Sequence, residues 1–317
     1  MNEALRLLEE QGEVLFTTQQ AYAVGLDDRS LLRLRKTGEC VRLTRGLYVL
    51  GSHQAVEPET AHLQLARGGL LLYPDAALSH ESALLAHGFP VWRINPSVVH
   101  LQRPVQHQVR RGSFVIDPWW MAMPDDREGA DAAPTPAVPV PTRAGPAVEP
   151  AVAVVQTTRV RGLVSGVIAA DHGLHHGVFT EADLAAAARV VSGWPDSSAV
   201  GAALELADGS SESPGESRCR VCLTVAGFEL VPQVRICDEH GVFVARVDFL
   251  LKGTKIALEF DGKVKYDTGD PSVLWAEKRR EDRLRELGYI VIRVTWADLD
   301  RPQQLFARIR AAMAIAA

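Results

Sequence analysis

The sequence predicts an α+β multidomain protein with an N-terminal helix-turn-helix segment that ends in a β-hairpin, a helical middle segment and a C-terminal α/β domain. Three observations favour this fold class: short capped helices near the N-terminus, an Ala- and Val-rich middle, and apolar strand-like runs near the C-terminus. At 317 residues the chain can hold two or three domains of ordinary size. Hydrophobic residues make up 47% and charged residues 23%, which excludes global disorder.

Two changes in composition divide the chain. Residues 124–150 are rich in Pro and Ala and almost free of large apolar residues, so we expect a flexible linker there. A shorter Ser- and Gly-rich break follows at 207–215. The expected boundaries are 1–55 for the helix-turn-helix with its hairpin, 56–123 for an α/β extension, 124–150 for the linker, 151–211 for the helical scaffold and 212–317 for the C-terminal domain.

Helix and strand signals near the N-terminus follow the order of a winged helix-turn-helix. Residues 3–11 pattern as a first helix, and a Thr at position 17 or 18 can cap a second one. An Asp at position 27 or 28 can cap a third helix. Residues 40–50 then read as two short strands, the wing, around an Arg-Gly turn. This layout predicts a winged helix-turn-helix.

The third helix carries the residue types that a DNA-recognition helix needs. We expect Leu31, Leu32 and Leu34 to face the core. Guanidinium groups reach phosphates and the guanine edge, and a hydroxyl near the cap can anchor a phosphate. The opposite side of the helix and the hairpin supply the candidate DNA-binding residues, which are Arg29, Ser30, Arg33, Lys36, Arg42 and Arg45. A solvated basic helix face is the alternative. The net charge of −5 counts only slightly against DNA, because local faces decide binding.

The run TTQQAYAVGLDDRSLLRLRKTGECVRLTRGLYVL combines a helix, a turn, a helix and an Arg-Gly-x-Tyr wing. With this run, residues 3–50 resemble the N-terminal winged helix of AbiEi-type antitoxins. Residues 58–123, which include ALSHESALLAHGFPVW, resemble the segment that follows in the same proteins. The resemblance implies binding to operator DNA, repression of the protein's own promoter and a cognate toxin as a partner. We interpret His80 and Glu81 as a capping arrangement.

The middle segment is predicted to be mostly helical. Thr180 with Asp183 three positions later has the pattern of a capping box. Three histidines, His172, His175 and His176, suggest a metal site at first sight. No cysteine or clustered carboxylate lies nearby in the sequence, so we interpret them as surface or packing residues. This segment is expected to be scaffold.

Apolar runs near the C-terminus predict a sheet with helices before and within it. The expected order is a helix at 216–226, strands at 230–236, 243–250 and 255–260, a helix at 272–287 and a strand at 290–294. Side chains alternate along a strand, so Glu259 and Asp261 point the same way, as does Lys263 if the strand continues. Asp248 lies toward the end of the neighbouring strand. Three carboxylates and an ammonium would thereby converge on one sheet edge.

Converging carboxylates repel one another unless a cation neutralises them. Hard divalent ions such as Mg²⁺ or Mn²⁺ bind carboxylates together with phosphate oxygens and water. The metal acidifies a water and stabilises charge on the phosphate, while a nearby Lys orients or deprotonates the nucleophile. The candidate catalytic residues for metal-dependent phosphodiester hydrolysis are Asp248, Glu259, Asp261 and Lys263. An acid followed by acid-x-Lys on the next strand is the PD-(D/E)XK nuclease signature.

Further motifs in residues 212–299 extend this pattern: Glu216-Ser217, Arg220, Gln233, RVDF, EFDG and EKRREDRLRELGYIVIRVTW. They resemble the domain family related to very-short-patch-repair endonucleases, within the PD-(D/E)XK superfamily. The resemblance implies that Asp248, Glu259 and Asp261 bind the metal, with Glu216 as an outer ligand and Gln233 at the edge of the site. Lys265 stands where many relatives carry a His, so a lysine would have to act as the base. A degenerate nuclease fold that no longer cleaves is the alternative.

Two more sets of residues leave alternatives open. Lys278 and Arg279 lie on the helix at 272–287 and could hold DNA phosphates, while pairing on the helix surface is the default. A structural zinc set with suitable spacing would consist of Cys219, Cys222, Cys237 and His240. Small buried cysteines on a core face explain the first pair as well.

No stretch approaches the ~18 consecutive apolar residues that span a bilayer, and the N-terminus is unlike a basic signal peptide. Four cysteines in a chain of this length do not make a disulfide framework. We therefore expect a cytoplasmic protein with reduced thiols and no membrane partner. The main hypothesis is a DNA-binding protein with a Mg²⁺- or Mn²⁺-dependent nuclease domain. The alternative is a non-catalytic repressor or antitoxin.

Overall fold

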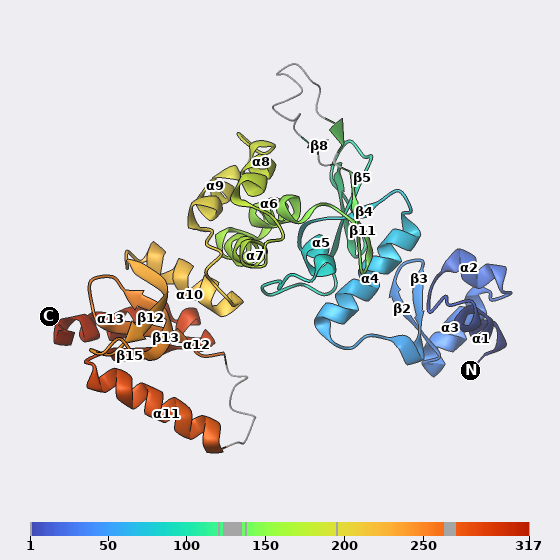
Figure 1. Ribbon diagram of the computed structural model, residues 1–317. Helices are drawn as coiled ribbons and strands as arrows, with labels where there is room; N and C mark the ends of the chain where they lie inside the picture. Colours follow the sequence, from blue (N-terminus) through green and yellow to red (C-terminus); the bar gives the residue numbers. More distant parts are fainter. Residues whose placement is uncertain are drawn as a thin grey trace. The chain divides into compact units, whose positions relative to one another are not determined.

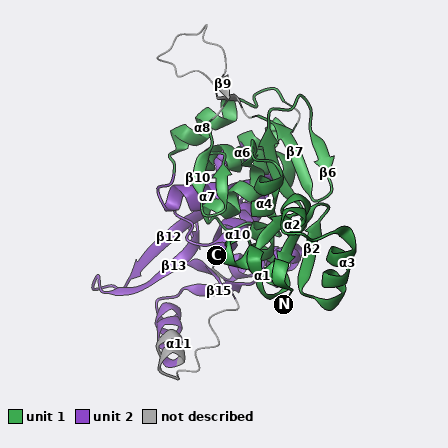
Figure 2. Ribbon diagram, turned by 90° about the vertical axis from the view of Figure 1, so that its right-hand side faces the viewer, with its two compact units in different colours: residues 1–162, 179–201 green, residues 163–178, 202–317 purple. Residues whose placement is uncertain are grey.

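The computed structural model describes residues 2–119, 121–122, 135–136, 138–194, 196–262 and 271–316. The chain forms two compact units, which Figure 2 shows in green and purple. Unit 1 consists of Met1–Gly162 and Phe179–Gly201, and unit 2 consists of Leu163–Val178 and Ala202–Ala317. The division falls inside the predicted helical scaffold, whose helices therefore contribute to two different cores.

Unit 1 begins with three short helices and a small sheet (Figure 1). In chain order the elements are α1 (Glu3–Glu10), β1 (Leu15–Thr17), α2 (Thr18–Ala23), α3 (Asp28–Thr37), β2 (Cys40–Thr44), β3 (Leu47–Leu50) and the 3-10 helix η1 (Gly51–His53). Thr17 caps α2 in a reciprocal capping box with Gln20. Asp27 caps α3 and Gly38, with φ of 78°, ends it. These helices begin where the sequence predicts because their caps use residues only three positions apart.

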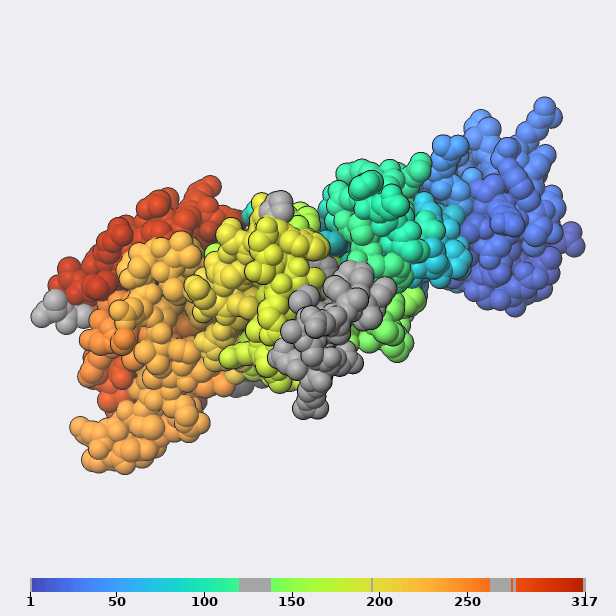
Figure 3. Space-filling view, turned by 90° about the horizontal axis from the view of Figure 1, so that it is seen from above, coloured from blue at the N-terminus to red at the C-terminus, as the bar shows by residue number. Residues whose placement is uncertain are grey.

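The helices and the sheet, in the order β1-β3-β2, enclose one core. Its buried members include Leu5, Leu8, Phe16, Leu26, Leu31, Leu34 and Tyr48. The prediction that Leu32 faces this core is wrong, because its side chain is 51% exposed. Each residue turns a helix by roughly 100°, which carries Leu32 away from the face that Leu31 and Leu34 share. In the space-filling view the first fifty residues form the blue lobe (Figure 3).

The remainder of unit 1 is a six-stranded sheet with helices. Its elements are α4 (Pro58–Leu72), β4 (Ala77–Leu78), α5 (His80–His87), β5 (Val99–Arg103), β6 (Val109–Arg111), β7 (Phe114–Pro118), β10 (Val140–Thr142), β11 (Gly145–Ala147), α6 (Pro150–Arg161) and α8 (Glu181–Arg189). A separate two-stranded ladder joins β8 (Met121–Ala122) and β9 (Thr135–Pro136). The strand order is β10-β11-β4-β5-β7-β6, in which β11–β4 and β5–β7 are parallel. Thr180 and Asp183 form the predicted capping box of α8.

The prediction of a flexible linker at 124–150 is wrong for its last part, which forms β10 and β11 and enters α6. β11 joins the sheet beside β4, where Ala147 pairs with Leu78. Pro141 and Pro146 oppose each other in the β10–β11 pair, and β10 is the edge strand, where proline costs the sheet few hydrogen bonds. The sequence does not reveal these strands because they contain too few large apolar residues.

Unit 2 contains a four-stranded sheet between two layers of helices. Its elements are α7 (Leu163–His175), α10 (Pro214–Val225), β12 (Leu230–Cys237), β13 (Phe243–Leu251), β14 (Ile256–Phe260), α11 (Pro271–Glu286), β15 (Ile290–Val294), α12 (Trp296–Asp300) and α13 (Pro302–Ala316), with α9 (Ser197–Leu206) across the boundary between the units. The strand order is β12-β13-β14-β15, antiparallel except for the parallel pair β14–β15. The elements from α10 to β15 follow the predicted order.

The two faces of this sheet bury different apolar clusters. One cluster joins the sheet to α10, α12 and α13 and includes Phe249, Leu258 and Leu305. The other includes Ala257 and Leu284 of α11. Figure 1 shows α11 on the side of the sheet away from α13. Among the described residues, no helix has both the length and the apolar character that crossing a membrane requires.

Candidate functional site

The exposed side of α3 presents a row of cationic side chains. Arg29, Arg33 and Lys36 are exposed and follow one another at spacings of four and three, so they lie on one side of the helix. Within the described part of the chain, no ion pair holds any of the three. Leu32 lies among them, with 51% of its surface exposed. The helix therefore offers three available cations around one apolar side chain.

Ser30, also predicted to contact DNA, belongs to the cap of α3. Its backbone N–H donates to Asp27 Oδ1 at 2.8 Å. Hydrogen bonds from Ser30, first from its side chain and then from its backbone, hold the pKa of Asp27 below its ordinary value. Ser30 thus positions the first turn of the helix.

β2 and β3 form the predicted wing, which turns at Arg45 and Gly46. Gly46 has φ of 81°, a left-handed conformation that glycine adopts without strain. Arg42 and Arg45 are both exposed, and Arg42 Nε donates to the carbonyl oxygen of Thr44 at 3.2 Å. The five predicted cations of the helix and the wing therefore all belong to one compact module.

Sequence reasoning missed two exposed residues of this module. Leu32 could have been found from its spacing of three from Arg29 and four from Lys36. Tyr22 on α2 is 48% exposed, and its hydroxyl donates to Asp28 Oδ1 at 2.7 Å. This hydrogen bond is the main cause that raises the pKa of Tyr22 above its ordinary value. No sequence signal connects Tyr22 to Asp28, because they lie on different helices.

In unit 2 the predicted carboxylates lie on β13 and around the end of β14. Asp248 accepts a hydrogen bond from a β14 backbone N–H at 2.7 Å. Glu259 accepts two hydrogen bonds from Arg280 of α11, at 2.8 and 3.0 Å. Asp261 Oδ2 lies 3.6 Å from Arg293 Nη1 of β15. Each carboxylate therefore has a partner within unit 2.

These contacts bear on the metal site that the resemblance implies. Within the described residues, donor atoms of Asp248, Glu259 and Asp261 do not gather within 4.8 Å of one another. A divalent ion would have to displace Arg280 and Arg293, because a guanidinium and a metal ion compete for the same carboxylate oxygens. As the structure stands, Glu259 and Asp261 are paired with these two arginines. Lys263 and Lys265 lie outside the described residues.

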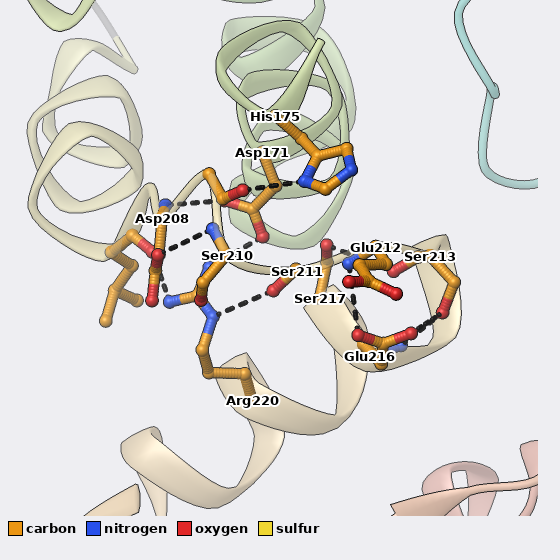
Figure 4. Close-up of polar contacts among 12 residues, drawn as sticks. Asp171, His175, Asp208, Ser210, Ser211, Glu212, Ser213, Glu216, Ser217 and Arg220 are labelled. Atoms are coloured by element: carbon orange, nitrogen blue, oxygen red, sulfur yellow. Dashed lines mark hydrogen bonds and ion pairs between the residues drawn. The ribbon is translucent and has the colours of Figure 1, made fainter. Parts of the chain in front are cut away.

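Glu216 and Gln233, predicted for the outer part of that site, touch each other (Figure 4 shows Glu216). Gln233 Nε2 and the Glu212 N–H both donate to Glu216 Oε2 at 3.0 Å. Ser213 Oγ donates to Glu216 Oε1 at 2.7 Å. The carboxylate of Glu216 is thus buried at the start of α10 and already holds three hydrogen bonds.

The basic side chains of α11 are only partly available to a ligand. Lys278 and Arg279 are exposed, and the Lys278 ammonium lies 5.7 Å from the ring centroid of Trp275. Arg283 and Arg285 are held in ion pairs with carboxylates. A face of paired arginines offers fewer contacts to phosphate than its count of arginines implies.

The structure does not bring the four proposed zinc ligands together. Cys219 and Cys222 pack in the core cluster of α10, α12 and α13, whereas Cys237 is exposed on β12 and His240 is exposed in the turn after it. Burial is the main cause that raises the pKa of Cys219, as expected for a thiol packed in the core. The core interpretation of the first pair accounts for both of its positions.

The interpretation of His80 and Glu81 as a capping arrangement is wrong. Ser79 is the N-cap residue of α5 and makes no side-chain capping bond. Glu81 is buried, and its Oε2 lies 3.2 Å from Arg161 Nε. The ring of His80 is buried and faces the sheet, where it lies against the ring of His100 at an interplanar angle of 38°.

Residues 2–51 match a family model described as "Transcriptional regulator, AbiEi antitoxin". The match covers α1 to β3, which is the module that exposes the cationic row and the wing. The match does not extend beyond residue 51.

Two curated proteins of Mycobacterium tuberculosis, the uncharacterized proteins MT2308 and Rv2248, are each 32% identical to this chain over 107 residues. The alignments cover 33% of this chain and 39% of each relative, so the chain spans about two fifths of their length. A crystal structure of the RV2827C protein from the same organism covers 72% of this chain and 82% of that chain, with 17% identity and a TM-score of 0.39. Residues 2–51 are therefore similar to the N-terminal domain of AbiEi-type transcriptional regulators and antitoxins.

Proposed function

We propose that this chain is a DNA-binding transcriptional regulator whose N-terminal module contacts an operator. The observation that carries the proposal is that the family match ends with β3 and so coincides with the module that exposes Arg29, Arg33 and Lys36. In a helix-turn-helix the second helix lies in the major groove. On this arrangement α3 is the recognition helix, and its arginines donate to guanine or to phosphate oxygens.

Local charge supports the proposal although the whole chain carries −5. Residues 28–46, from α3 to the wing, contain six Lys and Arg side chains and only two carboxylates. Three of the four charged residues of α1 are glutamates. Phosphates interact with the nearest face, so the acidic balance elsewhere does not oppose binding through α3.

Leu32 could add recognition of the base sequence to the charge interactions of Arg29, Arg33 and Lys36. An apolar side chain at the centre of a recognition helix can contact the methyl group of thymine, which no other base presents in the major groove. We therefore propose Leu32 as a base-contacting residue.

The experiment measures the affinity of the full-length protein for the DNA upstream of its own gene at several salt concentrations. Arg33→Glu and Arg45→Glu should each weaken binding and flatten its salt dependence, since each removes a contact that releases counterions. Arg6→Glu is the matched control, because Arg6 is an exposed arginine of the same module on α1. An equal loss in the control, or unchanged binding in both variants, would contradict the proposal.

The description of the matching family also supports an antitoxin role, with a toxin as the protein partner. The test is to co-express this chain with the product of any adjacent gene that arrests growth. Restored growth is expected. Continued arrest with soluble protein present argues against the antitoxin role and leaves the regulator proposal intact.

Unit 2 favours a second candidate, a metal-dependent nuclease that Mg²⁺ or Mn²⁺ would activate. The observation in its favour is that α10, β12 to β14, α11 and β15 follow one another in the order predicted from the sequence, with Asp248 on β13, Glu259 on the neighbouring β14 and Asp261 directly after β14. The arginines that pair with Glu259 and Asp261 make it the weaker candidate. Plasmid DNA incubated with Mn²⁺ and wild-type, Asp248→Asn or Asp261→Asn protein tests it. Cleavage by the wild type alone would support the nuclease.

A further inference from the structure

A buried group of polar side chains lies on one face of the six-stranded sheet in unit 1. His100 and Gln102 alternate with apolar residues along β5, so their side chains face the same way. β5 and β7 are parallel neighbours, and Gln102 is in register with Asp117. Asp117 therefore shares this face. His100 is 8% exposed and Gln102 is 2% exposed, so the group is almost closed to water.

His80 completes the group from the first turn of α5. Its φ of 51° is a left-handed conformation, which residues other than glycine adopt rarely and only where surrounding structure holds them. His80 Nδ1 lies 3.9 Å from Asp117 Oδ2, and His100 Nδ1 lies 3.8 Å from the same oxygen. The ring centroids of His80 and His100 are 4.6 Å apart. The left-handed backbone at His80 thus places a second imidazole close to Asp117 Oδ2, beside that of His100.

Three buried atoms of this group have no hydrogen-bond partner among the described residues: His100 Nδ1, Gln102 Oε1 and Asp117 Oδ2. A buried polar atom without a partner loses its hydration without compensation, so each one calls for an explanation. In the described part of the chain, His80, His100 and Asp117 are also the one set of three metal-ligating side chains with donor atoms all within 4.8 Å.

We propose that His80, His100 and Asp117 bind a divalent transition-metal ion, with Zn²⁺ as the best match. Two imidazole nitrogens and one carboxylate oxygen suit Zn²⁺ and its neighbours, whereas Mg²⁺ and Ca²⁺ prefer oxygen ligands alone. Bonds of about 2.0–2.1 Å in a tetrahedral site place ligand atoms roughly 3.3 Å apart. The side chains would therefore close around the ion by about half an ångström. Gln102 Oε1 or a water can take the fourth position.

The contacts around the group fit this assignment. Gln108 Nε2 donates to Asp117 Oδ1 at 2.7 Å, which orients the carboxylate as outer partners of metal ligands do. His80 Nδ1 lies 3.0 Å from Ser79 Oγ, and the ion would replace this contact. Asp117 is 15% exposed beside the exposed Gln108, which provides a route for the ion.

The test uses full-length protein that has been treated with a chelator and then titrated with Zn²⁺ in competition with a chromophoric chelator. We expect about one Zn²⁺ per chain and a higher Tm in its presence, because a ligand that binds only the folded state stabilises it. Co²⁺ should give a tetrahedral spectrum of nitrogen and oxygen ligands. A strong thiolate-to-cobalt band would place the ion on cysteines and overturn the proposal.

Two variants remove one ligand each with little change of shape. Asp117→Asn keeps the size of the side chain, and His80→Asn keeps a residue that tolerates the left-handed backbone. Each should lower Zn²⁺ affinity by more than the roughly 10- to 100-fold that loss of an outer partner costs. Gln108→Ala, on the surface, should lower it by about 10-fold.

The control is His176→Asn, since His172, His175 and His176 lie close together in unit 2, with His175 and His176 exposed, and could bind metal ions unspecifically. Unchanged stoichiometry in this variant supports the proposal, and loss of the bound ion in it overturns the proposal. Folded wild-type protein that binds no Zn²⁺ also overturns it. If the ligand variants do not fold, the Zn²⁺ affinity of Gln108→Ala and the Co²⁺ spectrum of the wild type still test whether the ion binds at this site.

Discussion

The arginines of α3 and those of α11 lie in opposite electrostatic surroundings. On α3, Arg29 and Arg33 are exposed and make no ion pair within the described residues. On α11, Arg280 holds Glu259 through two hydrogen bonds, and Arg283 is shared by two carboxylates. A phosphate must compete with an internal carboxylate for a paired guanidinium. A count of basic residues therefore does not tell how many of them are available to a phosphate, whereas their internal pairing does.

The largest effect, a loss of stability, is expected where a substituted arginine is both buried and part of an ion pair. Arg220 Nη2 donates to Asp171 Oδ2 at 2.6 Å, and both side chains are buried (Figure 4). Burial raises the pKa of Asp171, because it disfavours the charged carboxylate, and the charge of Arg220 offsets part of this effect. Arg220→Ala should lower the free energy of unfolding by about 3–5 kcal/mol, because it leaves a buried charge without a partner.

Denaturant unfolding measures this loss, and Arg285→Ala is the control. Arg285 pairs with Glu281 on the exposed surface of α11 in the same unit, so its removal should cost only about 0–1 kcal/mol. Equal losses in the two variants would show that burial does not distinguish the two ion pairs.

An intermediate effect is expected for an unpaired arginine of α3, and it should appear in binding alone. Arg33→Ala should weaken DNA binding by about 1–3 kcal/mol, while the free energy of unfolding changes by no more than about 0.5 kcal/mol. Fluorescence anisotropy and denaturant unfolding measure the two quantities. Arg35→Ala is the control, since Arg35 is exposed on the same helix but lies off the row. A greater loss of affinity in Arg35→Ala than in Arg33→Ala would contradict the assignment of Arg29, Arg33 and Lys36 as the side of α3 that contacts DNA.

A smaller effect is expected at Arg280, which is partly exposed. Arg280→Ala should lower the free energy of unfolding by about 0.5–1 kcal/mol, the range of a partly exposed ion pair. Arg280→Lys keeps the charge without the two-point contact and should recover part of the loss. If Arg280→Ala instead gains Mn²⁺-dependent cleavage of plasmid DNA, the arginine masks an active site and the nuclease becomes the better candidate.

The smallest effect is expected in the pH dependence of stability, and it concerns His87, which lies on neither α3 nor α11. Burial lowers the pKa of His87, whose Nε2 lies 2.9 Å from the carbonyl oxygen of Val148. Protonation then favours the unfolded chain, so stability is fully present above the unfolded pKa of about 6.5 and is lost as the pH falls through the folded value. His87→Gln should therefore reduce the decline of Tm between about pH 7 and 5. The exposed His107→Gln should leave that decline unchanged.

Local interactions explain why much of the fold could be predicted from the sequence. Thr17, Asp27 and Thr180 each cap a helix through a residue three positions away, so the sequence contains the whole interaction. The strands of unit 2 are apolar runs in the sequence, and β13 shows alternating burial in the sheet. The candidate DNA-binding surface also follows from spacing on one helix and its hairpin, except for Leu32.

The pairing of residues that are distant in sequence was decided only by the tertiary structure. Ala147 enters the sheet beside Leu78, and no composition of Pro and Ala encodes that neighbour. Glu259 of β14 and Asp261 just after it meet arginines of α11 and β15, and no spacing in the sequence predicts these ion pairs. His80, His100 and Asp117 come from a helix and two strands. The reason is common to all three cases: side chains meet when packing brings their elements together, and single-residue patterns do not carry that contact.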